Sequence, residues 1–160
     1  MVKGYSFTQI RLHWIIALLI VFQLIFGEDM GGAWRQVEQT GSADMTVMVW
    51  AHILVGVLVL VLALWRLSLR LSRGAPEAPD GPAAIKLAGH AAHWILYGLM
   101  IAAPIGGLLA WYGGVEAAAE IHEASKPAFI LLITLHVVGA LYHQFVVKDN
   151  LLNRMRQPAD

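Results

Sequence analysis

Residues 122–143 read HEASKPAFILLITLHVVGALYH, and this stretch decides what kind of fold the chain can adopt. It is apolar nearly throughout, as a helix that lies in lipid has to be, yet it carries His122, His136 and His143. Their spacings of 14 and 7 residues return to nearly the same face of an α-helix, because a helix makes one turn every ~3.6 residues. The pattern predicts a membrane helix that presents polar groups in one direction at several depths.

The composition of the whole chain is that of a membrane protein. Of its 160 residues, 58% are hydrophobic and only 14% are charged, and the mean hydropathy is +0.63. Four runs reach the length of about 20 apolar residues that a helix needs to cross the bilayer core. They cover roughly residues 10–27, 46–66, 90–112 and 126–147, and the helix of the last run is expected to begin at about 118. The sequence therefore predicts an all-α membrane protein, with a single integral-membrane domain over residues 1–160 that forms a bundle of four transmembrane helices.

The distribution of Lys and Arg predicts the orientation of this bundle. All of these residues except Arg35 and Lys126 flank the ends of the runs on one side of the membrane. They are Lys3, Arg11, Arg66, Arg70, Arg73, Lys86, Lys148, Arg154 and Arg156. By the positive-inside rule, both termini and the middle loop are expected in the cytoplasm. The formal net charge is zero, and nucleic acid is not expected as a partner.

The seven histidines are the candidate ligands, because the chain has no cysteine. Without thiolates, iron–sulfur clusters, thiolate-ligated haem, thiol redox chemistry and covalent haem attachment are all excluded. A histidine inside a membrane helix is a functional hypothesis by default, although it can also simply hydrogen-bond a neighbouring helix. The repetition of histidines at helical spacing favours the functional interpretation.

His122 and His136 are predicted to be ligands of two separate haems. Fourteen residues of helix rise about 21 Å, whereas seven rise only about 10 Å, too little to stack two porphyrins edge to edge. The direction of the helices places His13 in the cytoplasmic half and His52 in the outer half, so the expected pairs are His13 with His136 and His52 with His122. In a competing scheme, His143 is an alternative haem ligand that pairs with His13, and His52 pairs with His136.

Small and basic residues near the histidines suit a flat cofactor that carries acidic groups. Gly56 lies one turn beyond His52, where a missing side chain would let a macrocycle approach the backbone, although small residues also pack ordinary membrane helices. Pro104 and the glycines after it predict a kink in the third helix. The two propionates of a haem need cationic partners near the headgroups. Five residues are suitably placed for this: Arg11, Arg66 and Arg70 at the cytoplasmic end, and Arg35 and Lys126 at the outer end.

Four stretches resemble a known family and together span nearly the whole chain. They are YSFTQIRLHW, WAHILVGVLVLVLALWRLSLRL, LAGHAAHWILYGLMIAAPIGG and IHEASKPAFILLITLHVVGALYHQFVVKDNLLNRM. The chain resembles the bacterial cytochrome b561 proteins, within the four-helix di-haem b-type cytochromes. The resemblance implies two non-covalent haem b groups with bis-histidine ligation, a location in the bacterial inner membrane and exchange of electrons with ubiquinone. It implies His13, His52 and two of the three histidines of the fourth helix as ligands, without deciding which two.

Ligation by two histidines leaves no open iron site for dioxygen, so one-electron transfer is the expected chemistry. We expect an oxidoreductase that passes electrons from a small donor at the outer face to ubiquinone, and the resemblance suggests superoxide as the donor. Histidine exchanges protons near neutral pH, and His143, His90 and His93, near the cytoplasmic end, are expected to bind quinone or handle protons. The alternative function is a membrane-anchoring cytochrome b subunit that links a hydrogenase or formate dehydrogenase to the quinone pool.

Overall fold

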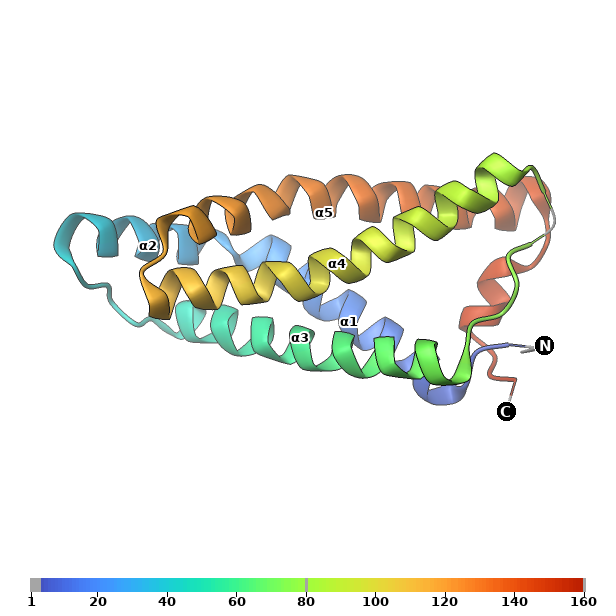
Figure 1. Ribbon diagram of the computed structural model, residues 1–160, viewed down its shortest axis with the longest axis horizontal. Coiled ribbons are helices and arrows are strands. Elements are labelled where there is room, and N and C mark those ends of the chain that lie inside the picture. Colours follow the sequence, from blue (N-terminus) through green and yellow to red (C-terminus); the bar gives the residue numbers. More distant parts are fainter. Residues whose placement is uncertain (1–3, 80, 160) are drawn as a thin grey trace.

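The computed structural model describes residues 4–79 and 81–159, and within these ranges the chain forms helices and loops but no strand. The elements are α1 (Phe7–Phe26), α2 (Glu28–Thr40), α3 (Val47–Arg73), α4 (Ala83–Gly113) and α5 (Glu116–Tyr142), then a π-helical turn, η1 (His143–Val147), and a 3-10 turn, η2 (Leu151–Met155). Four helices, α1, α3, α4 and α5, are long and apolar enough to cross a membrane, and they form one elongated bundle (Figure 1). The predicted all-α fold with four transmembrane helices is confirmed.

Short polar motifs explain where the helices begin and end. At the start of α1, the hydroxyl of Ser6 accepts from the backbone N–H of Gln9, and the side-chain oxygen of Gln9 accepts from the backbone N–H of Ser6, which is a capping box. Thr46 caps α3 through its side chain. Gly41 follows α2 and Gly114 follows α4. Their φ angles of 78° and 64° are left-handed, a conformation that costs glycine little.

The helices extend beyond the apolar runs. α3 continues past position 66 to Arg73, and α4 begins at Ala83, ahead of the expected start at 90. Hydropathy marks the part of a helix that crosses lipid, whereas backbone hydrogen bonding continues into polar ends that are rich in good helix formers. The polar helix α2 was not expected, although its first turn holds Glu28 and Asp29, which favour a helix N-terminus.

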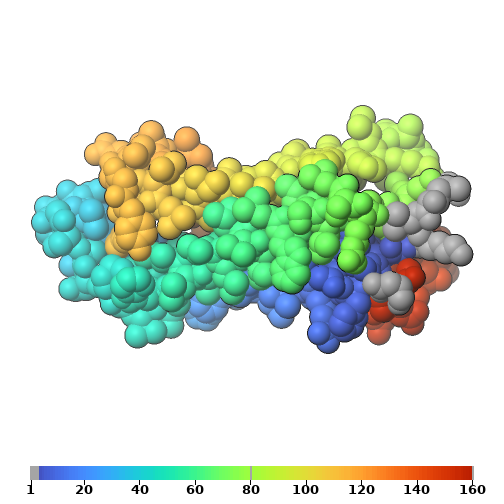
Figure 2. Space-filling model, turned by 60° about the horizontal axis from the view of Figure 1, so that its bottom comes forward, coloured from blue at the N-terminus to red at the C-terminus, as the bar shows by residue number. Residues whose placement is uncertain are grey.

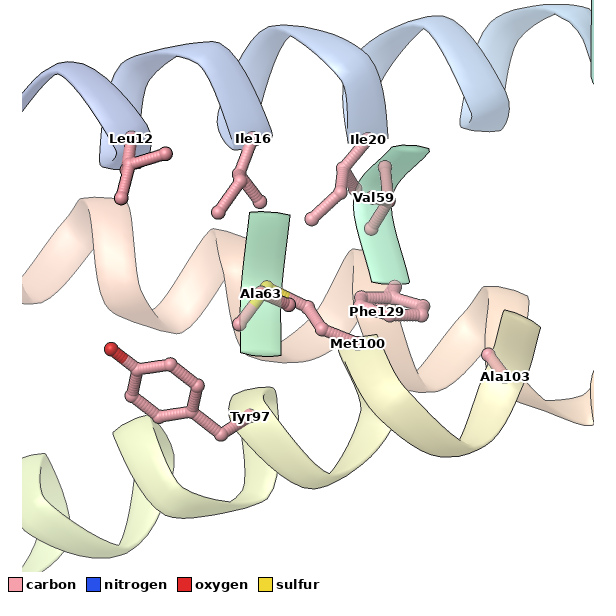
Figure 3. Packing of buried hydrophobic residues seen from close by; sticks show 9 residues of the cluster. All are labelled: Leu12, Ile16, Ile20, Val59, Ala63, Tyr97, Met100, Ala103 and Phe129. Carbon is pink, nitrogen blue, oxygen red and sulfur yellow. The ribbon is translucent and has the colours of Figure 1, made fainter. Parts of the chain in front are cut away.

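The buried core lies in the middle of the bundle and receives side chains from all four long helices (Figure 3). Its members are Leu12, Ile16, Ile20, Val59, Ala63, Tyr97, Met100, Ala103 and Phe129. Many other large apolar residues, among them Leu18, Leu54 and Leu131, are exposed, as expected for helices that are apolar all round and surrounded by lipid. Figure 2 shows one long face of the molecule, along which α3 and α4 lie.

The first and last described residues and the loop between α3 and α4 lie at the same end of the bundle (Figure 1). The backbone N–H of Ala159 donates to the carbonyl oxygen of Tyr5 at 3.1 Å. The guanidinium of Arg154 donates to the carbonyl oxygen of Glu77, in the loop between α3 and α4, at 2.8 Å. A shared end agrees with the expectation that both termini and the middle loop lie on one side of the membrane. That this end faces the cytoplasm stays a prediction from the charge distribution.

Candidate functional site

α5 carries both of the widely spaced histidines on one uninterrupted helix. It runs from Glu116 to Tyr142 and includes Pro127. A proline inside a helix removes one backbone hydrogen bond, but the helix continues through it here. His122 and His136 therefore keep the helical spacing from which the two pairs were predicted.

One pair of histidines lies in the half of the bundle that holds the chain ends. The ring centroids of His13 on α1 and His136 on α5 are 6.1 Å apart, and the ring planes are inclined by 61°. Arg66 on α3 lies near both rings, and its Nε is buried without a hydrogen-bond partner. We call His13 and His136 the inner pair.

A second pair lies in the opposite half of the bundle. The ring centroids of His52 on α3 and His122 on α5 are 6.0 Å apart, with the planes at 85°. Nδ1 of His122 lies 2.7 Å from the carbonyl oxygen of Ala103 on α4, so this nitrogen donates its hydrogen and Nε2 keeps a lone pair. Nδ1 of His52 is buried with no hydrogen-bond partner. We call His52 and His122 the outer pair.

Close backbone and amide contacts surround the outer pair. A Cβ atom at Gly107 would lie 3.1 Å from Cε1 of His122, and one at Gly27 would lie 3.7 Å from Cε1 of His52. Gln23 on α1 donates from Nε2 to the carbonyl oxygen of His52 at 2.8 Å, while its Oε1 is buried without a partner. The spacing of the histidines does not predict these contacts. Gln23 does stand out in the sequence as an amide inside an apolar run.

The two histidines of α4 lie in different environments. The ring centroid of His93 is 5.1 Å from that of His136, and its Nδ1 lies 2.6 Å from the carbonyl oxygen of Gly89. His90, one turn earlier, is exposed. The structure therefore separates two residues that were expected to share a role, because only His93 lies beside the inner pair.

His143 lies outside both pairs. It begins η1, directly after α5, and its Nδ1 lies 2.5 Å from Oδ2 of Asp149. Among the described residues, one ring contact joins the two members of the inner pair and another joins the two members of the outer pair. Within the same residues, no ring contact joins His143 to His13. The structure thus brings together the histidines of the first pairing scheme and not those of the competing scheme.

The basic residues at the inner end differ in their surroundings. Arg66 is largely enclosed, as its buried Nε shows. The guanidinium carbon of Arg70 lies 5.5 Å from the ring centroid of Trp94, whereas that of Arg11 lies 4.0 Å from the ring centroid of Phe7 on the exposed side of α1. Of the three candidates for a haem propionate, Arg66 is the one that lies near both rings of the inner pair.

The basic residues at the outer end lie at the surface. Lys126 lines a hollow on α5 together with Glu120 and Glu123, and Arg35 is exposed on α2. Positive charge at this end is therefore accompanied by carboxylates, which weaken its attraction for an anion in solution.

The paired rings have the separation that a shared iron requires. Metal–nitrogen bonds of about 2 Å on either side of an ion would put two imidazole centres about 6 Å apart, which agrees with the measured 6.1 and 6.0 Å. No group of three or more His, Cys, Asp or Glu side chains that could hold a metal ion occurs in residues 4–79 and 81–159. An ion at either pair would thus have only two protein ligands, and a haem, whose macrocycle fills the other positions, fits this requirement.

The fold and the paired histidines define a class, the four-helix membrane cytochromes of the b type. The model of the family described as prokaryotic cytochrome b561 matches residues 4–158 of this chain. A cytochrome b562 of Cereibacter sphaeroides is 42% identical over 155 residues, which cover 97% of this chain and 96% of that protein. A probable superoxide oxidase, CybB, of Yersinia pestis is 29% identical over 178 aligned residues, with 96% of each chain covered. A cytochrome b561 homolog 1 of Escherichia coli is 30% identical over 173 aligned residues, which cover 94% of this chain and 96% of that protein.

The chain belongs to the prokaryotic cytochrome b561 family. It is therefore a multi-pass bacterial membrane protein that takes part in electron transfer, and its family implies haem b as the cofactor.

Proposed function

We propose that this cytochrome carries electrons across the membrane through two b haems, one held by the inner pair and one by the outer pair, and delivers them to ubiquinone. The placement of the two pairs carries this proposal. Each pair joins α5 to a different neighbour, α1 or α3, and the 14 residues between His122 and His136 correspond to about 21 Å along the helix. Two redox groups at different depths would give an electron a path between the two faces.

Haem b bound between two histidines exchanges one electron at a time and has no free position for dioxygen. The side chains around it would hold it and exclude water. The carbonyl oxygen of Ala103 accepts from Nδ1 of His122, so Nε2 would be the nitrogen that holds the iron. Phe129, midway along α5 between the pairs, belongs to the apolar core that keeps water out of the space between them. The buried charge of Arg66 would pair with a propionate at the inner site.

Superoxide is the donor that we propose at the outer face. A relative at 29% identity is named a probable superoxide oxidase, and Lys126 and Arg35 are the cations at this end. Two superoxide anions would each lose one electron and leave as dioxygen. One ubiquinone would take up those two electrons and two protons and leave as ubiquinol. Because Glu120 and Glu123 lie beside Lys126, the attraction of the anion has to be local rather than a property of the whole surface.

The acceptor site is proposed at the opposite end, where His143, His93 and His90 lie. His93 touches the inner pair, His143 follows α5 directly and His90 is exposed. Both protons of the ubiquinol would come from the water at this end, which we take to be the cytoplasm. Of the three histidines, His143 is the one whose ring is held by a carboxylate, and we assign it the proton transfer.

The test is the formation of ubiquinol by the purified cytochrome when superoxide is generated enzymatically in the presence of ubiquinone-1. We expect one ubiquinol for every two superoxide anions consumed, and no ubiquinol when superoxide dismutase is added. Haem that is reduced chemically and then reoxidised by ubiquinone, but is never reduced by superoxide, would contradict the donor. Reduction only by a hydrogenase or formate dehydrogenase that purifies with the chain would favour the subunit function instead.

A further inference from the structure

The segment after α5 has an unusual backbone that places one carboxylate against His143. α5 passes into the π-helical turn η1, and the backbone N–H of Lys148 closes this turn on the carbonyl oxygen of His143 at 2.7 Å. Lys148 and Asn150, on either side of Asp149, have φ angles of 60° and 58°. Residues other than glycine seldom adopt such angles, and π-helical turns and left-handed residues are both enriched at functional sites.

Both oxygens of Asp149 are used within this turn. Oδ2 lies 2.5 Å from Nδ1 of His143, and Oδ1 accepts from the backbone N–H of Leu151 at 3.0 Å. The side chains of His143 and Asp149 are 18% and 20% exposed, so the contact is partly shielded while the ring keeps access to its surroundings. The carboxylate cannot turn away without losing its backbone hydrogen bond.

The rest of the C-terminal segment is tied to the bundle. The indole N–H of Trp14 on α1 donates to the carbonyl oxygen of Met155 at 2.9 Å, and Arg154 donates to the carbonyl oxygen of Glu77. These bonds join the segment to α1 and to the loop between α3 and α4. The turn that contains Asp149 is therefore held at both ends, by α5 and by the docked η2.

We propose that Asp149 is a positioning residue for proton transfer by His143, an inference that rests on the proposed reduction of ubiquinone. The carboxylate accepts the hydrogen of Nδ1, which fixes the ring orientation and leaves Nε2 as the nitrogen that gives and takes the mobile proton. Each ubiquinone takes up two electrons from the cytochrome and two protons from water to become ubiquinol. Nε2 of His143 passes a proton to a quinone oxygen and is reprotonated from water.

The experiment follows the reoxidation of the holoprotein by ubiquinone-1 after chemical reduction, so it does not depend on the outer donor. Reduced cytochrome is mixed with ubiquinone-1 in a stopped-flow spectrometer, and the loss of the reduced haem absorbance gives a saturating rate and a half-saturating concentration. Asp149→Asn keeps the size of the side chain and removes its charge. The matched control is Asp44→Asn, which makes the same change at an exposed residue in the connection between α2 and α3.

We expect Asp149→Asn to lower the saturating rate by about tenfold or more, with a larger solvent deuterium isotope effect and a half-saturating concentration within about twofold of wild type. Asp149→Glu should recover part of the rate, and Asp44→Asn should behave as wild type. A purely structural role of Asp149 would change the haem content or the binding of ubiquinone-1, and it would leave the isotope effect unchanged. A wild-type saturating rate in Asp149→Asn would overturn the proposal.

His143→Gln separates this inference from the function on which it rests. If His143→Gln slows reoxidation and Asp149→Asn does not, the positioning role fails while proton transfer by His143 stands. If His143→Gln reacts with ubiquinone-1 at the wild-type rate, both assignments fail. Nitrogen-15 NMR of the wild-type holoprotein tests the contact without an Asp149 variant, with the His143 signals identified by their loss in His143→Gln. A proton on Nδ1 is expected, and a neutral ring protonated only on Nε2 would overturn the proposal.

Discussion

At the scale of single residues, His122 is fixed in place by its neighbours on α4. Its Nδ1 donates to the carbonyl oxygen of Ala103, and the absence of a side chain at Gly107 leaves room for the ring. Pro104 lies between these two positions inside α4. The stretch that the sequence predicts only as a kink is therefore the surface on which a candidate ligand rests.

Gly107→Ala is predicted to disturb the outer pair alone. The added Cβ would lie 3.1 Å from Cε1 and 3.2 Å from Nδ1 of His122, so the ring would have to move, at a cost of about 1–3 kcal/mol for overpacking. We expect the loss of one of two haems, or a shifted spectrum for one, measured as the haem-to-protein ratio and the reduced spectrum. Gly98→Ala is the control on the same helix, because a Cβ there meets nothing within 4 Å. Two haems with an unchanged spectrum in Gly107→Ala would contradict the close contact.

Single substitutions of the histidines of α5 and η1 are predicted to separate ligands from bystanders. His122→Gln and His136→Gln should each retain one haem, since each removes one member of a pair. His143→Gln should retain two, because His143 is bonded to Asp149 instead. The haem-to-protein ratio decides this. Loss of haem in His143→Gln, together with full retention in His122→Gln, would show that the competing pairing is correct.

How far the candidate site can be predicted from the sequence depends on the kind of contact. The spacing of His122 and His136 along one helix, combined with the alternating direction of the helices, leads to the pairs that the structure brings together. The contacts of Gln23 and Gly107 join different helices, so they cannot be predicted from the spacing of residues along one helix. The separation of His93 from His90 depends on how α4 is rotated against α5, which hydropathy alone does not set.

At the scale of elements, α5 is the helix on which both candidate haem sites depend. It supplies one histidine to each pair, and its continuity through Pro127 keeps them on one face. Its neighbours α1 and α3 each contribute to one pair only. Both sites therefore depend on the angle about the axis of α5 that separates His122 from His136.

An alanine inserted after Ile130 is predicted to break this relation. One extra residue rotates the two halves of α5 against each other by about 100°, so His122 and His136 can no longer both face their partners. We expect about one haem per chain or fewer, measured against protein content. An alanine inserted after Gly81, in the loop between α3 and α4, is the control and should leave the ratio unchanged. Full haem content after insertion at Ile130 would mean that the two pairs do not depend on a single helical register.

The long helices could be predicted from the sequence because apolar runs of sufficient length have few alternatives in a membrane. The remaining elements lack such a signal. α2 is a polar helix, and η1 brings His143 and Asp149 together through left-handed residues at Lys148 and Asn150. Hydropathy does not depend on backbone geometry of this kind. Neither position is a glycine, the residue type that would have indicated a left-handed backbone.

At the scale of the whole molecule, the arrangement of the ends agrees with the distribution of charge. The N-terminal residues, the middle loop and the C-terminal segment share one end through the bonds of Tyr5 with Ala159 and of Glu77 with Arg154. Most Lys and Arg residues belong to that end. Proton uptake for ubiquinol and donor oxidation are accordingly proposed on opposite sides of the membrane.

This orientation is predicted to appear in reporter fusions. A green fluorescent protein joined after Asp160 should fluoresce in the bacterial cell, because it folds in the cytoplasm, and alkaline phosphatase at the same position should be inactive. Alkaline phosphatase inserted between Gly41 and Ser42, at the end of α2, should be active. The reverse pattern would place the inner pair and His143 at the outer face, and the proposed direction of electron flow would have to be reversed.

We propose that each chain holds two b haems, one between His13 and His136 and the other between His52 and His122. The most direct test is the haem content of the purified wild-type chain, measured by pyridine haemochrome against amino-acid analysis, with electron paramagnetic resonance of the oxidised protein on the same sample. Two haems per chain, both low-spin as two imidazole ligands require, are the expected result. A single haem, or a high-spin iron with an open position, would contradict the claim.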